Sequence, residues 1–199
     1  MKITAIKEQV KNPHRVSVFI DGKYTFSLTL EQLLEEKLKK DMDIDDPELT
    51  RLKRLSDEGK LKVKALDWLM MRPHSTREFR DYAFRKKIEK DLLEVWIAEF
   101  TAKKYIDDHY FAQWFADNRM RKNKSKRFIV AELRSKGIAQ DVAQQVVDNQ
   151  GSDDEDALRQ LVSKLRSKPR YQDEKKLIAH LLGKGFRYDT IKEALKPQQ

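Results

Sequence analysis

The adjacent carboxylates Asp107 and Asp108 are the residues whose types and spacing come nearest to a catalytic pair. Neighbouring carboxylates can coordinate Mg²⁺ or serve as an acid and a base. Here they stand directly before residues 109–121, where Phe111 and Phe115 recur at helical spacing. Carboxylates at the start of a helix accept hydrogen bonds from its exposed amides and favour the positive end of its dipole. We therefore expect helix capping, with a magnesium-dependent nuclease as the less favoured interpretation.

The other reactive side chains form no recognisable site in the sequence. The four histidines lack a metal-ligand spacing such as HExxH; they are His14, His74, His109 and His180. Cysteine is absent, which removes disulfides, thiolate catalysis and zinc–sulfur sites. The six glycines form neither a Walker A loop nor a dinucleotide fingerprint. We therefore predict no catalytic residue, no metal site and no cofactor.

Several aromatic side chains could stack on nucleic-acid bases. They are Trp68, Trp96, Phe111, Trp114 and Phe115. Their positions coincide with the apolar faces of predicted helices, so we expect most of them to pack in a core.

The stretch RMRKNKSKRFIVAELRSKGI, residues 119–138, concentrates positive charge on a helical pattern. It has eight basic residues and one acid, Glu132, between Arg119 and Lys136. The basic residues are Arg119, Arg121, Lys122, Lys124, Lys126, Arg127, Arg134 and Lys136. Such a density of like charge repels itself unless an anion or an acidic protein surface offsets it. The alternative is a merely solvated face of a helical bundle.

A second basic group precedes this stretch by about 50 residues. Its members are Arg77, Arg80, Arg85, Lys86 and Lys87. The chain as a whole has 42 Lys and Arg against 33 Asp and Glu, a net charge of +9. Residues 1–60 are balanced, whereas 61–150 contribute +6 and 151–199 contribute +3. The two groups predict a basic stripe that binds a polyanion such as nucleic acid.

The first 59 residues have the pattern of a small antiparallel sheet. RVSVFIDGKYTFSLT alternates apolar residues on both sides of Asp21-Gly22, a preferred pair for a type I′ turn. KITAIKEQV supplies a third strand, and LEQLLEEKL a short helix. Pro47 suits the first turn of another helix. We expect this segment to cover the first helices rather than to bind a ligand.

From residue 60 onward the sequence repeats itself. The segment that begins at residue 131, AELRSKGIAQDVAQQVV, matches the segment 48 residues later, AHLLGKGFRYDTIKEAL. A weaker copy, YAFRKKIEKDLLEVWI, begins at residue 82 and aligns with the residue-131 segment at an offset of 50. The match pairs Lys136 with Lys184 and Gly137 with Gly185. A fixed period indicates tandem units. We predict three repeats of three helices, at 60–107, 108–151 and 152–199.

The predicted helices fall at equivalent places in each repeat. The first helices span about 61–71, 109–121 and 156–166; the second, 76–85, 126–135 and 173–182; the third, 90–100, 140–148 and 188–195. Gly137 and Gly185 should end the second helix in a left-handed conformation, a place that Lys87 takes in the first repeat. Asp141 and Asp189 should open the third helix. The predicted fold is mainly α, an elongated tandem array of three-helix repeats with a small N-terminal antiparallel β segment.

Two segments resemble the central block of the RecX family, the regulators of the RecA recombinase. They are YIDDHYFAQWFADNR (105–119) and KSKRFIVAELRSKGI (124–138). The shared pattern is an aromatic, Ile or Val and two Asp, then Phe-Ala, an Arg, and a Leu-x-x-Lys-Gly-Ile end. The repeats extend the resemblance over about 60–196, and the N-terminal sheet resembles the extension of longer members. Ser125 stands where the family usually has glycine, and longer members continue past the third repeat.

The resemblance implies a protein without catalysis of its own that acts in DNA repair, recombination and the SOS response. Such proteins bind RecA, lie in the groove of its filament on DNA, and modulate strand exchange, ATP hydrolysis and coprotease activity. The family also binds DNA, single- or double-stranded, so the basic residues of both groups are the expected contacts. An independent DNA-binding protein of the helix-turn-helix kind is the alternative. No apolar run reaches the length of a membrane span and the N-terminus has no apolar export segment, so we expect a cytoplasmic monomer.

Overall fold

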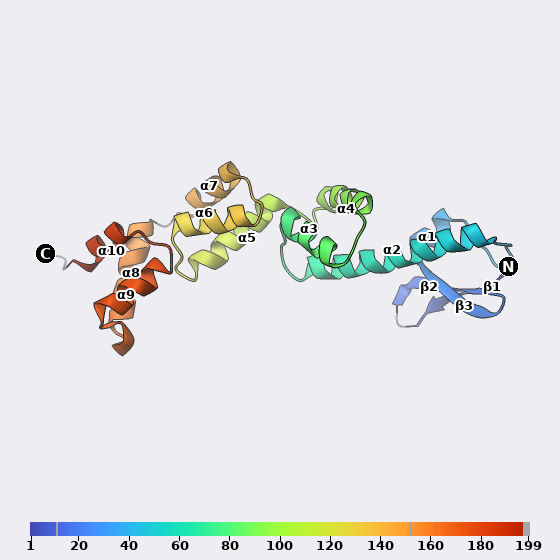
Figure 1. The fold of residues 1–199 in the computed structure, drawn as a ribbon, viewed down its shortest axis with the longest axis horizontal. Coiled ribbons are helices and arrows are strands. Elements are labelled where there is room, and N and C mark those ends of the chain that lie inside the picture. The colour runs from blue at the N-terminus through green and yellow to red at the C-terminus, as the bar shows by residue number, and fades with distance from the viewer. Residues whose placement is uncertain (11, 152, 197–199) are drawn as a thin grey trace. The chain divides into compact units, whose positions relative to one another are not determined.

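The computed structural model describes residues 1–10, 12–151 and 153–196 of the 199-residue chain. Within these residues, ten α-helices and one 3-10 helix follow a three-stranded antiparallel sheet (Figure 1). The predicted fold class, mainly α with a small N-terminal sheet, is confirmed. The chain divides into two compact units, Met1–Met71 and Arg72–Gln199. None of the described helices combines the length and the apolar character needed to cross a membrane.

The sheet of the first unit has the strand order β1-β2-β3, from β1 (Ile3–Gln9), β2 (Asn12–Ile20) and β3 (Lys23–Thr29). Asp21 and Gly22 have φ of 47° and 80°, as the predicted type I′ turn requires. The pairing between β2 and β3 contains one irregularity. Val18 pairs with Phe26, but the next residue, Phe19, pairs with Tyr24, so Thr25 is skipped. This irregularity leaves Phe26 buried and Tyr24 exposed.

Two helices complete the first unit. A capping box between Thr29 and Gln32 begins α1 (Leu30–Glu35). The second, α2 (Asp46–Met70), has Pro47 in its first turn, as predicted. It continues without a break to Met70, where a separate helix at 61–71 was expected. Gly59 does not interrupt it, because its missing side chain makes room for Gln32: a Cβ there would lie 2.8 Å from Oε1 of Gln32.

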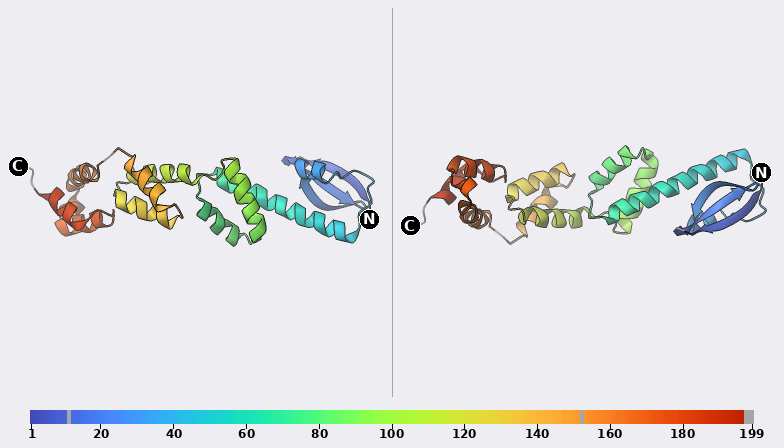
Figure 2. Two further views of the ribbon diagram at one scale, coloured as in Figure 1. Left: turned by 90° about the horizontal axis from the view of Figure 1, so that it is seen from above. Right: turned by 90° about the horizontal axis from the view of Figure 1, so that it is seen from below.

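The sheet packs on α2 through a buried polar contact as well as apolar side chains. The Ser56 hydroxyl donates to the carbonyl of Ser27 at 2.6 Å, and the Ser27 amide points to the same hydroxyl at 3.3 Å. The two views of Figure 2 show the three strands lying along the N-terminal part of α2. Leu52 of α2 belongs to the same apolar core as Val18 and Leu28.

The second unit contains the remaining helices in the predicted order. They are α3 (Thr76–Arg85), α4 (Lys90–Ala102), α5 (Asp108–Met120), α6 (Lys126–Ser135), α7 (Gln140–Asp148), α8 (Asp154–Arg166), the 3-10 helix η1 (Pro169–Tyr171), α9 (Glu174–Leu182) and α10 (Tyr188–Leu195). The helices predicted at 76–85, 126–135, 140–148 and 188–195 begin and end at the expected residues.

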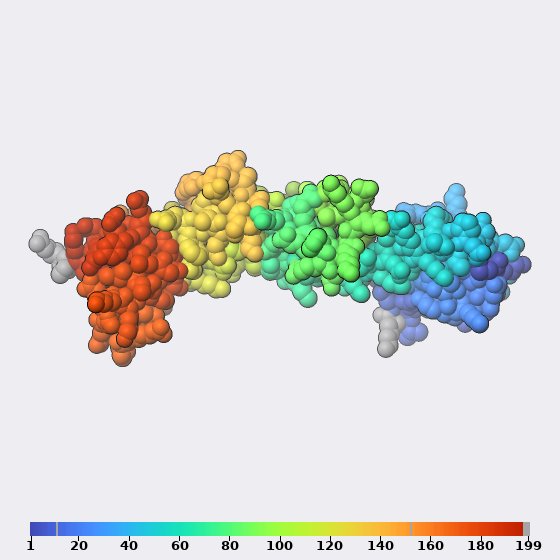
Figure 3. Space-filling view, viewed as in Figure 1, coloured from blue at the N-terminus to red at the C-terminus, as the bar shows by residue number. Residues whose placement is uncertain are grey.

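The last two three-helix groups have separate apolar cores. One is formed by α5, α6 and α7 around Phe111, Ile129 and Leu133, and the other by α8, α9 and α10 around Leu158 and Leu181. Figure 3 shows the two groups, yellow and then orange to red, in contact. Core packing is confirmed for the predicted aromatics that are buried. These are Trp96, Phe111 and Phe115, whereas Trp68 and Trp114 are half-buried.

Consecutive repeats meet where the second helix of the earlier repeat begins. At the first joint, the Ser75 hydroxyl donates to the carbonyl of Lys136 at 2.7 Å, and the Thr76 amide donates to Asp108 at 2.7 Å. At the second joint, the Ser125 amide donates to the carbonyl of Lys184 at 3.0 Å.

The Lys126 amide, in the place of Thr76, donates to both oxygens of Asp154, at 3.0 and 3.1 Å. At each joint, therefore, the next repeat supplies a carboxylate and a carbonyl as acceptors for donors at a helix start. Amides at a helix start have no acceptor within their own helix, which explains why this position suits a junction.

Gly137 and Gly185 adopt the predicted left-handed conformation, with φ of 87° and 95°. Their lack of a side chain also allows the repeats to approach. A Cβ at Gly137 would lie 2.7 Å from Cβ of Arg77, and one at Gly185 would lie 2.3 Å from Cβ of Phe128. Lys87 has the same handedness, with φ of 56°, but its side chain is exposed.

Asp141 and Asp189 lie in the first turns of α7 and α10, as predicted. They are not the N-caps, however. Those positions belong to Ala139 and Arg187, which form no side-chain capping hydrogen bond. Both carboxylates therefore act on these helices through the dipole.

We predict that Gly185→Ala lowers the free energy of unfolding by at least about 2 kcal/mol, because an L-residue is strained at this φ and its Cβ meets Phe128. Urea unfolding followed by circular dichroism measures the change. Gly151→Ala is the control: nothing lies within 4 Å of a Cβ there, so a change below about 0.5 kcal/mol is expected. Equal effects of the two substitutions would contradict the close approach.

Candidate polyanion-binding surface

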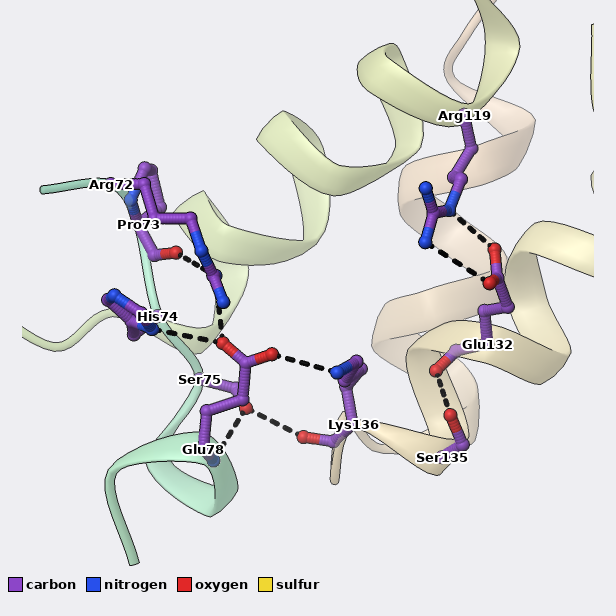
Figure 4. Close-up of polar contacts among 9 residues, drawn as sticks. All are labelled: Arg72, Pro73, His74, Ser75, Glu78, Arg119, Glu132, Ser135 and Lys136. Carbon is purple, nitrogen blue, oxygen red and sulfur yellow. Dashed lines mark hydrogen bonds and ion pairs between the residues drawn. The ribbon is translucent and has the colours of Figure 1, made fainter. Parts of the chain in front are cut away.

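The predicted cations divide into those neutralised by ion pairs and those left exposed. Arg119 belongs to the first class. Its Nε and Nη2 donate to the two carboxylate oxygens of Glu132 at 2.6 and 3.2 Å, joining α5 to α6 (Figure 4). The guanidinium also lies 4.5 Å from the ring centre of Phe115. Arg119 is therefore a packing residue whose charge is largely offset.

Arg80 is likewise neutralised. It forms a two-pronged ion pair with Glu94, which joins α3 to α4. Hydrogen bonding within the pair raises the pKa of Arg80 and lowers the pKa of Glu94. The sequence could not reveal either arginine's partner, because each acid is 13 or 14 residues away and on another helix.

Lys136 belongs to a larger cluster at the first joint, centred on Glu78. One oxygen of Glu78 accepts from Nη1 of Arg72 at 2.8 Å and lies 3.1 Å from Nδ1 of His74. The other lies 2.9 Å from Nζ of Lys136. Figure 4 shows the three basic side chains converging on this carboxylate. The guanidinium of Arg72 also lies 5.5 Å from the ring centre of Trp114.

Glu78 is charged throughout the physiological range. Burial by itself raises the pKa of this carboxyl, but the hydrogen bonds and charges of Arg72 and Lys136 outweigh burial and lower the pKa to about 2. The cluster thus fixes α3 to the turn after α6. It also removes Lys136 from the set of free cations.

The α6 segment has the cations that are least explained by packing. Every other α-helix of the second unit has an acid in its first turn, whereas α6 has none and begins with Lys126 and Arg127. Cations at this end oppose the helix dipole, at a cost of roughly 0.3–1 kcal/mol each. Arg121, Arg127 and Arg134 are exposed, and in the described part of the chain no carboxylate forms an ion pair with any of them. This arrangement suits an external anion.

The second basic group, between Arg77 and Lys87, is less uniform than the sequence suggested. Arg77 packs beside Gly137 at the first joint, and Nε of Arg85 donates to the carbonyl of Asp81 at 3.3 Å. Lys86 and Lys87 are exposed; Nζ of Lys86 lies 5.8 Å from the ring centre of Tyr82.

Lys122 and Lys124 lie in the turn before α6 and face the third repeat. Nζ of Lys124 donates to the carbonyl of Gly183 at 2.7 Å, and the carbonyl of Lys122 accepts from Nζ of Lys184 at 2.6 Å. Lys184 was not among the predicted site residues. The repeat alignment, which pairs it with Lys136, is the signal that could have identified it.

Of the carboxylate pair, Asp107 caps the helix that follows it, as predicted. Asp107 accepts from the amides of His109 and Tyr110, both at 3.0 Å. The hydrogen bond from the Tyr110 amide is the main cause of its lowered pKa. Asp108 reaches a different helix, since it accepts from the Thr76 amide of α3. Among the described residues, no group of three or more His, Asp or Glu side chains is arranged to hold a metal.

Three parts of the chain match models of one protein family. Residues 1–45 match "Regulatory protein RecX N-terminal domain", residues 107–147 match "RecX, second three-helix domain", and residues 153–195 match "RecX, third three-helix domain". This family is one of regulatory proteins.

Relatives and solved structures agree with the match. The "Regulatory protein RecX" of Bacillus pumilus (strain SAFR-032) is 31% identical over 98% of this chain and 76% of the relative. That of Bacillus subtilis (strain 168) is 30% identical over 97% of this chain and 75% of the relative. A solved structure, "Crystal structure of regulatory protein RecX", shares the fold with a TM-score of 0.73 at 22% identity, over 96% of this chain and 98% of that one.

The Glu78 cluster predicts a specific dependence of stability on pH. Because the pKa of Glu78 is about 2 in the folded state and that of an unperturbed glutamate is 4.5, this group's stabilisation is fully present above about pH 4.5 and is lost as the pH falls towards 2. The shift corresponds to on the order of 3 kcal/mol. Glu78→Gln should therefore destabilise the protein at pH 7 and flatten the loss of stability between about pH 5 and 2.5. Urea unfolding followed by tryptophan fluorescence measures this.

Glu193→Gln is the control for that experiment. Glu193 is an exposed acid whose ion pair with Lys196 lies on the surface, and such pairs contribute little. Its curve of stability against pH should parallel that of the parent. A Glu78→Gln curve as steep as the parent's below about pH 5 would contradict the structural role of the cluster.

Proposed function

The chain belongs to the RecX family, and from that premise we propose that it is a non-catalytic regulator that binds the RecA filament and its DNA. It acts in the cytoplasm as a monomer and modulates strand exchange, ATP hydrolysis and coprotease activity. The matched family supports the regulatory role. The reversed charge at the start of α6 supports a polyanionic partner, because those cations cost stability where they are.

The binding surface in this proposal is the exposed part of the two basic groups. Its centre, around α6, is formed by the exposed Arg121, Arg127 and Arg134 together with the half-buried Lys126. Arg127 and Arg134 are seven residues apart and so lie on one face of the helix. Lys86 and Lys87 after α3 extend the surface into the first repeat. Arg119, Arg80 and Lys136 support it by fixing helices and the first joint, since their charges are already paired.

The function is tested by RecA ATPase activity on single-stranded DNA. We expect the protein to lower the ATPase rate or to disassemble filaments at concentrations too low to coat the DNA. No effect on either measurement would overturn the proposal. Protection of one duplex sequence without any effect on RecA would instead support an independent DNA-binding protein.

The surface is tested by replacing Arg121, Lys126, Arg127 and Arg134 with alanine together. If all four contact phosphates of single-stranded DNA, the log–log salt slope should flatten by roughly 0.7 per contact, about three units. The melting temperature should change little, because exposed charges contribute little to stability.

The matched control removes the same charge from the first unit. Lys39, Lys40, Lys53 and Lys64 are exposed lysines outside both basic groups, and their replacement by alanine should leave the salt slope within about one unit of the parent's. Equal effects of the two quadruple variants would show that net charge, rather than the α6 surface, determines binding.

A further inference from the structure

The two joints between repeats have related backbone contacts, but an acid offsets the cations only at the first joint. Ser75 and Ser125 are the N-caps of α3 and α6, and the turns after α6 and α9 approach them. Three positions into each helix, the first joint has Glu78 and the second has Phe128. The cations are kept, since Lys184 takes the place of Lys136. The second joint thus retains a lysine whose acidic partner has been replaced by a phenyl ring.

Two ammonium groups lie at this second joint, one from each repeat. Nζ of Lys124 donates to the carbonyl of Gly183 at 2.7 Å, and Nζ of Lys184 donates to the carbonyl of Lys122 at 2.6 Å. Nζ of Lys124 also lies 3.9 Å from the ring centre of Phe128. Carbonyl dipoles and an aromatic face attract a cation but add no negative charge. Each ammonium has two further N–H donors beyond the one given to a carbonyl.

The surroundings are positive as well. The pKa of Lys184 is lowered by burial and by the charges of Lys124 and Lys122. The pKa of His180, on α9, is lowered by burial and then by four cations of the joint and of the η1 turn: Lys184, Arg170, Lys124 and Lys168. Asp154, a carboxylate that enters this joint, accepts from the Lys126 amide. Among the described residues, no acid forms an ion pair with Lys124 or Lys184.

We propose that the joint between the second and third repeats is a phosphate-binding site, in which a phosphate held by the ammonium groups of Lys124 and Lys184 supplies the negative charge that Glu78 supplies at the first joint. A phosphate suits it because its several oxygens accept from both ammonium groups at once. The source of the phosphate, a DNA backbone, rests on the proposed function, whereas the site itself does not. A bound phosphate would contact both repeats.

The site is tested on the full chain by amide NMR, with the first joint as an internal control. The probes are inorganic phosphate, oligothymidylate and an abasic phosphodiester oligomer. We expect saturable shifts of the Ser125, Lys184 and Gly185 amides, and unchanged positions for their counterparts Ser75, Lys136 and Gly137. No shift at the second joint with any probe, or equal shifts at both joints, would overturn the proposal.

The three probes also distinguish the source of the phosphate. The concentrations to compare are those of phosphate groups at which the shifts saturate. If both oligomers saturate the shifts at a much lower concentration than inorganic phosphate does, a nucleic-acid backbone is the ligand. Saturation by inorganic phosphate at an equal or lower concentration supports the site with a free anion as its ligand. If the protein shows these shifts but has no effect on RecA, the phosphate site is supported and the proposed function is overturned.

A charge introduced at Phe128 gives a sharper test, because it leaves both lysines in place. Phe128→Glu supplies the acid that the first joint already has and creates a capping box with Ser125, so the helix should fold. The new carboxylate should weaken phosphate binding by roughly tenfold or more. Phe128→Gln introduces a side chain of the same shape as glutamate but without charge, and it should bind phosphate within about threefold of the parent. Equal binding by the two variants would overturn the site.

Removal of the lysines supplies an independent measurement. The double variant Lys124→Gln, Lys184→Gln should flatten the salt slope for oligothymidylate by about 1.4 units, roughly 0.7 per contact. The double variant Lys164→Gln, Lys175→Gln removes the same charge from exposed positions of the third repeat and is the control. A slope that changes equally in both would overturn the assignment of Lys124 and Lys184.

Discussion

The second unit depends on satisfying the backbone amides at the start of each repeat's second helix. These groups have no acceptor within their own helix, and a helix start buried against another repeat loses water as a partner. The structure uses the next repeat: Thr76 donates to Asp108 and Lys126 to Asp154. The turn after the second helix of that next repeat must then approach the same helix start. Only a glycine in a left-handed conformation permits this approach, and it is found at residues 137 and 185. Periodicity, glycine placement and acidic first turns are thus consequences of one junction repeated.

This junction explains what the sequence could and could not reveal. The helix ranges were predictable because capping, apolar spacing and left-handed glycines are local signals. The role of Asp108 was not, because a carboxylate before an apolar helix reads as a cap of its own helix, whereas it accepts from α3. Gly59 is a comparable case, since a helix-weakening residue lies inside α2 where Gln32 needs the space. In both cases a tertiary contact outweighs the local preference.

The basic surface illustrates the same limit for charge. A count of cations treats Arg119 and Arg127 alike, but the crossing of α5 and α6 brings Glu132 to the first and leaves the second exposed. Ion pairs between helices depend on geometry that sequence spacing does not define. The informative local signal was instead the missing acid in the first turn of α6. A local rule broken at a cost in stability is typical of a functional site, and here the Asp154 carboxylate of the next repeat offsets only the Lys126 end of the first turn.

The two joints show how one junction can serve both structure and binding. At the first, Glu78 offsets the surrounding cations, so the contact between repeats is complete without a ligand. At the second, Phe128 leaves Lys124 and Lys184 to repel each other across the contact. A ligand shifts a conformational equilibrium only by its differential affinity for the two states. In the proposed site, a phosphate held from both sides binds the joined arrangement better than a separated one, and so it would stabilise the junction in proportion to its own affinity. A phosphate would then strengthen the attachment of the third repeat, whereas the attachment of the second repeat to α3 already includes its acid, Glu78.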